Sequence, residues 1–118
     1  CESVGVLILG GEMNRRHNNL EGYLTNMNIR NLRADKCFIG INGIDEIFGY
    51  STTNFPEAEQ KMEMAKSSIK SYILADHTKF GKTYMAKVDI ECDFIITNKR
   101  MEEYNYEWLE EKCLLLTP

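Results

Sequence analysis

The sequence has few of the features that would place a protein in a membrane, outside the cell or on nucleic acid. No apolar run approaches the ~18 residues of a membrane-spanning helix, and no basic and then apolar leader opens the chain, so neither a membrane span nor a signal peptide is predicted. Fourteen Lys and Arg residues against eighteen Asp and Glu residues give a net charge of −4, with no basic stripe. This disfavours direct DNA or RNA binding, because neutralising phosphates requires clustered positive charge.

Cysteine is scarce and dispersed. No Cys-x-x-Cys pair occurs, and the four cysteines lie in or beside apolar runs, at Cys1, Cys37, Cys92 and Cys113. This spacing favours buried reduced thiols over a disulfide framework or metal ligands. We therefore expect a cytoplasmic protein with no metal site and no cofactor.

The 118 residues suffice for one domain, and no internal repeat, low-complexity tract or Pro-rich linker interrupts them. The hydrophobic fraction of 43% and the charged fraction of 27% are those of an ordinary soluble globular domain. Because the chain opens with Cys1 rather than Met, we expect it to be a fragment of a longer protein.

Apolar runs alternate with amphipathic segments along the chain. Strands are predicted at residues 4–9, 37–41, 72–75, 84–88 and 93–97. Helices are predicted at about 20–32, 54–70 and 101–112, and surface loops at 12–19 and 49–54. The apolar face of the first helix consists of Leu20, Tyr23, Leu24 and Met27. Asn54 and Glu57 form a capping-box-like start to the second helix. This alternating order predicts a mostly parallel sheet covered by helices.

Glycines and polar side chains follow three of the predicted strands. They are Gly10 and Gly11 after the first, Gly40, Asn42, Gly43 and Asp45 after the second, and Asp76 and Lys79 after the third. In a parallel sheet all three loops lie on the same carboxyl edge, where open α/β sheets bind ligands. Taken singly, the motifs have simpler interpretations, namely a glycine turn in the second loop and an ion pair closing a turn in the third.

Five stretches stand in a recognisable order: Leu-Gly-Gly-Glu at 9–12, Asp-Lys-Cys-Phe-Ile-Gly-Ile-Asn-Gly-Ile-Asp at 35–45, Phe-Gly-Tyr-Ser-Thr at 48–52, Ala-Asp-His-Thr-Lys-Phe-Gly at 75–81, and Ile-Ile-Thr-Asn at 95–98. Together they resemble the effector-sensing domain of DeoR-family bacterial transcriptional regulators. The resemblance implies a three-layer α/β sandwich with a mostly parallel sheet, of the sugar-phosphate isomerase type shared with ribose-5-phosphate isomerase and glucosamine-6-phosphate deaminase. It also implies a phosphorylated sugar as effector, a homo-oligomer (dimer or tetramer), and DNA binding only through a separate helix-turn-helix domain.

The sequence departs from the family pattern in two ways. The N-terminal winged helix-turn-helix and the first strand with its Gly/Ser/Thr-rich phosphate loop are missing, so we expect residues 1–118 to be a fragment of the sensor domain. At the end of the last strand, where the family usually has an acidic residue, this chain has Asn98.

We expect the glycines and polar residues of the second loop to line the sugar site, Gly10 and Gly11 to let the first loop come near, and Lys61 to face the same edge. Asp76 would accept hydrogen bonds from sugar hydroxyls or orient Lys79, and Lys79 would attract the anionic ligand.

Comparison with the family's enzymes argues against catalysis. Gln60 aligns with the glutamate base of the isomerases, and an amide cannot take a proton at neutral pH, although Glu57 and Glu59 stand nearby. No histidine occurs in residues 40–45, where the deaminases use one. The favoured hypothesis is a sensor that binds without turnover. An isomerase-like enzyme and an oligomerisation domain without ligand are the alternatives.

Overall fold

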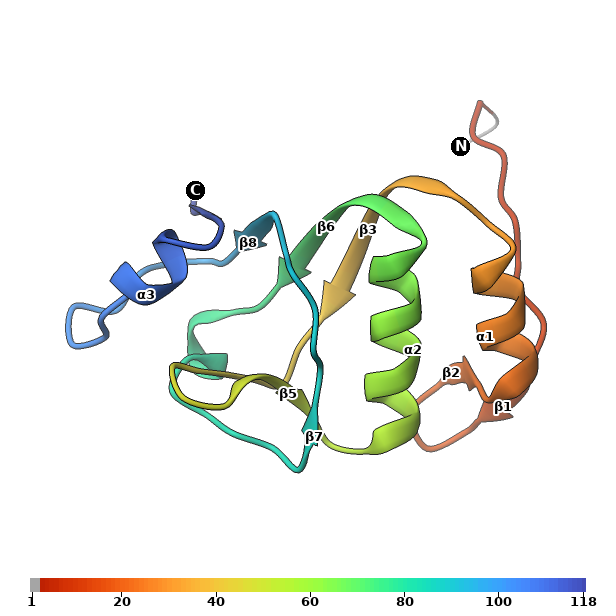
Figure 1. Ribbon diagram of the computed structural model, residues 1–118, viewed down its shortest axis with the longest axis horizontal. Helices are drawn as coiled ribbons and strands as arrows, with labels where there is room; N and C mark the ends of the chain where they lie inside the picture. Colours follow the sequence, from red (N-terminus) through yellow and green to blue (C-terminus); the bar gives the residue numbers. More distant parts are fainter. Residues whose placement is uncertain (1–2) are drawn as a thin grey trace.

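A four-stranded parallel sheet, in the order β3-β6-β8-β9, forms the centre of the structure, a computed structural model that describes residues 3–118 (Figure 1). Its strands are β3 (Ala34–Gly40), β6 (Ser68–Leu74), β8 (Phe94–Ile96) and β9 (Leu114–Leu116). Ile39, Ile73 and Ile95 lie opposite one another on three neighbouring strands, and all three are buried. The predicted α/β class and the mostly parallel sheet are confirmed.

Antiparallel strands form two further sheets within residues 3–118. A second sheet has the order β4-β5-β7, with β4 (Gly43–Asp45), β5 (Gly49–Thr52) and β7 (Ala86–Lys87), and a separate hairpin joins β1 (Glu12–Asn14) to β2 (Asn19–Glu21). The predicted loops at 12–19 and 49–54 are therefore partly strand. Ser51 and Thr52 of β5 are polar yet buried, which their composition did not reveal.

The helices are α1 (Tyr23–Arg30), α2 (Phe55–Lys66) and the short α3 (Glu107–Glu110), with a 3₁₀ turn η1 (His77–Lys79). The predicted cap of α2 is confirmed, since Asn54 Oδ1 accepts the N–H of Glu57 at 2.9 Å. The helix ends at Lys66 rather than near residue 70, because β6 begins at Ser68, which pairs with Ala34 of β3. No helix in residues 3–118 has the length and apolarity needed to cross a membrane.

Two apolar predictions near the start of the chain are wrong. Residues 4–9 form no strand, and Val6 and Ile8 are each 82% exposed. A buried parallel strand needs a neighbour in the sheet, and no strand within residues 3–118 pairs with this run. Tyr23 and Leu24, predicted to lie on the buried face of α1, are also exposed, and the helix buries Thr25 and Ile29 instead.

The predicted last helix is reduced to the four residues of α3. Before it, the chain is irregular because Tyr104 and Tyr106 pack edge-on against Phe80, and the Tyr106 hydroxyl accepts the N–H of Met101 at 2.8 Å. The contacts of Phe80 with the two tyrosines join residues far apart in the sequence, so they cannot be predicted from the spacing of apolar residues within a helix. β9, which follows α3, was not predicted.

One face of the parallel sheet carries a row of exposed or half-buried apolar side chains. Phe38, Tyr72 and Phe94 stack across β3, β6 and β8, with ring centroids 4.8 Å and 4.6 Å apart. Leu114 of β9 continues the row, and both it and Phe38 are more than half exposed. We call these four residues the aromatic face. Parallel sheets are ordinarily covered on both sides, so this face is a candidate for a further contact.

Candidate functional site

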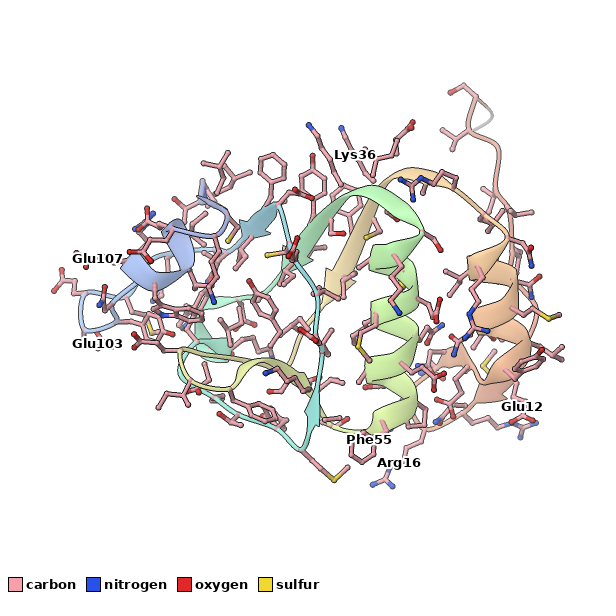
Figure 2. The ribbon with its side chains drawn as sticks, in the orientation of Figure 1. Glu12, Arg16, Lys36, Phe55, Glu103 and Glu107 are labelled. Carbon is pink, nitrogen blue, oxygen red and sulfur yellow. The ribbon has the colours of Figure 1, made fainter. Side chains whose placement is uncertain are left out.

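A cavity of about 750 Å³ opens at the carboxyl edge of the parallel sheet. We call it the rim cavity; it is lined by residues 17, 40–42, 53, 57, 61, 74–76, 79 and 96–98. Three of these groups are the ends of β3, β6 and β8. The others come from the connection between β5 and α2, the first two turns of α2, the 3₁₀ turn η1 and the β1–β2 hairpin. Figure 2 shows why α2 contributes: Phe55, at its start, lies at the end of the sheet opposite Lys36.

The structure places five of the nine predicted site residues in the lining of the rim cavity. They are Gly40, Asn42, Lys61, Asp76 and Lys79. The expected meeting of loops at one edge therefore occurs for the loops after β3 and β6. The loop at residues 10–11 follows no strand and does not line the cavity.

At the end of β6, the Asp76 side chain is fixed by hydrogen bonds, whereas, among the described residues, the Lys79 side chain is not. Asp76 caps η1, and its Oδ1 accepts both the N–H of Thr78, at 2.8 Å, and the Thr78 hydroxyl. These bonds hold the pKa of the Asp76 carboxyl below its ordinary value, because they favour the charged form. No salt bridge within residues 3–118 joins Asp76 to Lys79, so the turn is closed by Thr78 rather than by an ion pair. The Lys79 ammonium is not committed to that turn.

Asn98 joins the end of β8 to this loop. Its Oδ1 accepts the N–H of His77 at 2.8 Å, and its Nδ2 lies 3.0 Å from His77 Nδ1. An amide can donate and accept at once, whereas a carboxylate only accepts. Asn98 thus positions η1 and also lines the rim cavity.

Glu57 on the first turn of α2 is surrounded by donors. Its Oε2 lies 3.1 Å from the Thr52 hydroxyl and 3.4 Å from the Thr53 hydroxyl, and its Oε1 lies 3.9 Å from Nδ1 of His17. The Thr52 hydroxyl is also 2.6 Å from Asn42 Oδ1. This network fixes the wall of the rim cavity between β3 and α2. Glu57 therefore has hydrogen-bond partners other than Lys61.

Lys61 lies one turn further along α2 and, within residues 3–118, shares none of the hydrogen-bond partners of Glu57. Burial lowers the pKa of its ammonium, and the Glu57 carboxylate partly opposes that shift. No hydrogen bond or salt bridge in the described part of the chain holds the Lys61 side chain. A desolvated cation that faces a cavity without a partner is suited to receive an anion.

The other predicted site residues have structural roles outside the rim cavity. Gly11 has φ +142°, and a Cβ there would collide with the side chain of Thr25, whose hydroxyl donates to Gly10 O at 2.8 Å. A Cβ on Gly43 would meet the carbonyl oxygen of Lys82.

Asp45 closes the turn from β4 to β5, because its Oδ2 accepts the N–H groups of Ile47 at 3.0 Å and Phe48 at 2.7 Å. Gln60, aligned above with the isomerase base, also lies outside the lining and donates to Leu20 O at 2.8 Å.

Several residues that line the rim cavity were not predicted from the sequence as site residues. Glu57 had a usable signal, because it precedes Lys61 by four residues and so shares its helix face. Thr53, just before the Asn54 cap, had a weaker one. His17 had none, since its approach depends on the fold of a polar hairpin that the sequence predicts only as a loop.

The fold is that of an α/β domain, and the rim cavity lies at the carboxyl edge of its sheet, where open α/β sheets ordinarily bind ligands. Comparison with known families is specific: the model of the DeoR C-terminal sensor domain matches residues 1–99, and the chain belongs to this family. The match confirms the resemblance and the sugar-phosphate isomerase-like fold.

The relatives are transcription regulators. The chain is 30% identical over 114 residues to the HTH-type transcriptional regulator GolR of Listeria innocua, covering 95% of this chain and 45% of that protein. It is 28% identical to a putative aga operon transcriptional repressor of Escherichia coli O157:H7, covering 94% and 42%, and 32% identical over 77 residues to the lactose phosphotransferase system repressor of Staphylococcus aureus, covering 65% and 30%. The chain thus spans less than half the length of these relatives. The relatives are named as regulators rather than enzymes, which indicates a non-enzymatic sensor domain.

Proposed function

We propose that this domain binds a phosphorylated sugar in the rim cavity and thereby controls DNA binding by a separate helix-turn-helix domain. The observation that carries the proposal is the combination, in one cavity, of two lysines without fixed salt-bridge partners, Lys61 and Lys79, with the ordered carboxylate of Asp76.

The chemistry of the lining matches the two ends of such a ligand. A phosphate needs cationic donors, which the lysine ammonium groups supply. Sugar hydroxyls both donate and accept, and they match the carboxylate of Asp76 and the amide of Asn42, which also line the cavity. Gly40, without a side chain, leaves room for close approach to the backbone.

The proposed control of DNA binding is inferred from the relatives of this chain. They are named as transcriptional regulators or repressors, and they are more than twice as long as this chain. We infer that a DNA-binding part accompanies the sensor in the whole protein, which acts in the cytoplasm. The effector alters DNA affinity only if it binds the two arrangements of the regulator unequally.

We also propose that the domain associates with a second copy of itself. The aromatic face supports this, because Phe38 and Leu114 expose apolar area on a sheet that would ordinarily be covered. Sedimentation of the chain as a function of concentration tests the proposal, and Phe38→Lys should shift the chain towards monomer. A wild type that stays monomeric at all concentrations contradicts it.

Thermal unfolding against a panel of sugar phosphates and the corresponding free sugars tests the binding proposal. A ligand at a hundred times its Kd stabilises the folded state by about 2.7 kcal/mol, a shift of several degrees for a domain of this size. We expect at least one phosphorylated sugar to raise Tm, its free sugar to have little effect, and Asp76→Ala and Lys79→Ala to abolish the shift. If no sugar phosphate raises Tm, the proposal fails.

A further inference from the structure

A second cavity, of about 550 Å³, shares no lining residue with the rim cavity. Cys92, two residues before β8, lines it together with Tyr50 of β5 and the lysines at 87 and 112. Cys92 is buried within the protein core, but one side of its surroundings is this cavity rather than packed side chains. A small molecule that enters the cavity therefore approaches the thiol.

A second thiol, Cys113, lies beside Cys92. β8 and β9 run parallel with Phe94 opposite Leu114, and the N–H of Leu114 donates to Asp93 O at 3.0 Å, so Cys113 lies next to the Cys92–Asp93 peptide. In this register Cys113 lies opposite Asp93, so Cys92 is its diagonal neighbour. A strand spacing of ~4.8 Å and a rise of ~3.3 Å per residue put their Cα atoms about 6 Å apart, within the separation of about 4.4–6.8 Å that a disulfide spans. Both cysteines are buried in the same core cluster and are free.

The surroundings of Cys92 favour its thiolate. The Tyr50 hydroxyl lies 3.1 Å from Cys92 Sγ and can donate to it. The printed partner of the Cys113 thiol is Leu109 O, to which it donates at 3.4 Å. The nearby Cys113 and the Tyr50 hydroxyl hold the pKa of the Cys92 thiol below its ordinary value, while the pKa of Cys113 is raised. Thiolates, rather than thiols, are the nucleophiles in cysteine oxidation.

We propose that Cys92 and Cys113 form an oxidisable pair in which Cys92 reacts first with a hydroperoxide and Cys113 then closes a disulfide. The Cys92 sulfur attacks one peroxide oxygen, the O–O bond breaks, and the sulfur is oxidised to a sulfenic acid while hydroxide or alkoxide leaves. The Cys113 sulfur displaces the sulfenic oxygen, which departs as water. With hydrogen peroxide the sum is two thiols and one peroxide giving one disulfide and two waters.

Cys37 provides a control within the same molecule. It is also buried and free, but its neighbour is the Ser71 hydroxyl, 3.5 Å from its Sγ, instead of a second thiol. The reduced chain is treated with hydrogen peroxide, its remaining thiols are alkylated after denaturation, and its peptides are mapped by mass spectrometry. We expect a Cys92–Cys113 cross-linked peptide that reverts on reduction, with Cys37 still alkylated. The proposal is overturned if Cys92 and Cys113 remain reduced, or if the disulfide joins another pair.

Two substitutions test the order of the steps. Tyr50→Phe keeps the ring but removes the donor, and should slow the reaction of Cys92 by about fivefold, the effect of one net hydrogen bond. Cys113→Ala should stop oxidation at a sulfenic acid on Cys92, which a dimedone-type reagent traps. An unchanged rate in Tyr50→Phe, or sulfenic acid appearing on Cys113 of the wild type before it appears on Cys92, would contradict the assignment of Cys92 as the first thiol.

Discussion

Replacing Lys61 by methionine should separate ligand binding from stability. Methionine has a similar length and a similar helix propensity, so α2 and the cavity wall keep their shape while the charge is lost. If the ammonium receives the phosphate of the effector, the substitution removes one charge-assisted hydrogen bond. Such a bond contributes about 1.5–3 kcal/mol, which corresponds to a rise in Kd of about 10- to 150-fold.

Lys61→Met should not destabilise the ligand-free protein, although it weakens binding. Burial holds the pKa of Lys61 below its unfolded value, so the charged side chain disfavours folding at neutral pH. This penalty is fully present below the folded pKa and fades as the pH rises towards the unfolded value of 10.5. Lys61→Met removes the penalty, so its free energy of unfolding at pH 7 should equal or exceed that of the wild type.

The assay is titration calorimetry of each variant with the sugar phosphate that stabilises the wild type and with its free sugar. Lys66→Met, on an exposed position of the same helix and outside the rim cavity, is the matched control and should bind as the wild type does. Lys61→Met should lose affinity for the phosphorylated ligand and leave any affinity for the free sugar nearly unchanged. Wild-type affinity for the sugar phosphate in Lys61→Met would refute the role of Lys61 as a phosphate contact.

Further predictions concern the frame around the cavity, and chemical denaturation measures each of them. Gly11→Ala should destabilise the chain by about 1–3 kcal/mol, because its positive φ and the approach of Thr25 both exclude a Cβ; a change within experimental error would contradict this. Asn54→Ala should cost about 1 kcal/mol through loss of the α2 cap, and Asn54→Ser should restore most of it. Ile73→Ala should cost about 2–5 kcal/mol, since Ile73 is fully buried in the central sheet, and a loss below 1 kcal/mol would show that the core lies elsewhere. Asp76→Asn should remove stability that the wild type has above the ordinary carboxyl pKa of 3.8 and loses as the pH falls through the lower folded value, so the two stability curves should converge in acid.

The sequence was most informative where an apolar run ended in polar residues. The runs before Gly40 and Asp76 predict buried parallel strands, and parallel strands necessarily bring their carboxyl ends to one edge, so the two loops could be placed together without coordinates. The cap at Asn54 was equally accessible, because it depends on residues three apart. These inferences depend on local chemistry and on general rules of sheet topology.

Other features could not be predicted because they depend on contacts between distant residues. The apolar run at residues 4–9 has the composition of a buried strand, but burial requires a neighbouring strand, and none within residues 3–118 pairs with this run. The composition around Ser51 and Thr52 predicts a loop. The two residues are buried because Tyr84 N and Asn42 supply hydrogen-bond partners from outside β5. The position of His17 beside Glu57 likewise results from the fold of the hairpin.

The most direct test of the central claim is a titration of the isotope-labelled chain with the stabilising sugar phosphate, followed by amide chemical shifts in NMR spectra. We expect the largest shifts at the ends of β3, β6 and β8 and on the first turns of α2, including Asn42, Lys61, Asp76 and Asn98. We expect only small shifts around Asp45 and at Gly10 and Gly11, which lie outside the rim cavity. Saturable shifts confined to another surface, or none at all, would contradict the assignment of the rim cavity as the effector site.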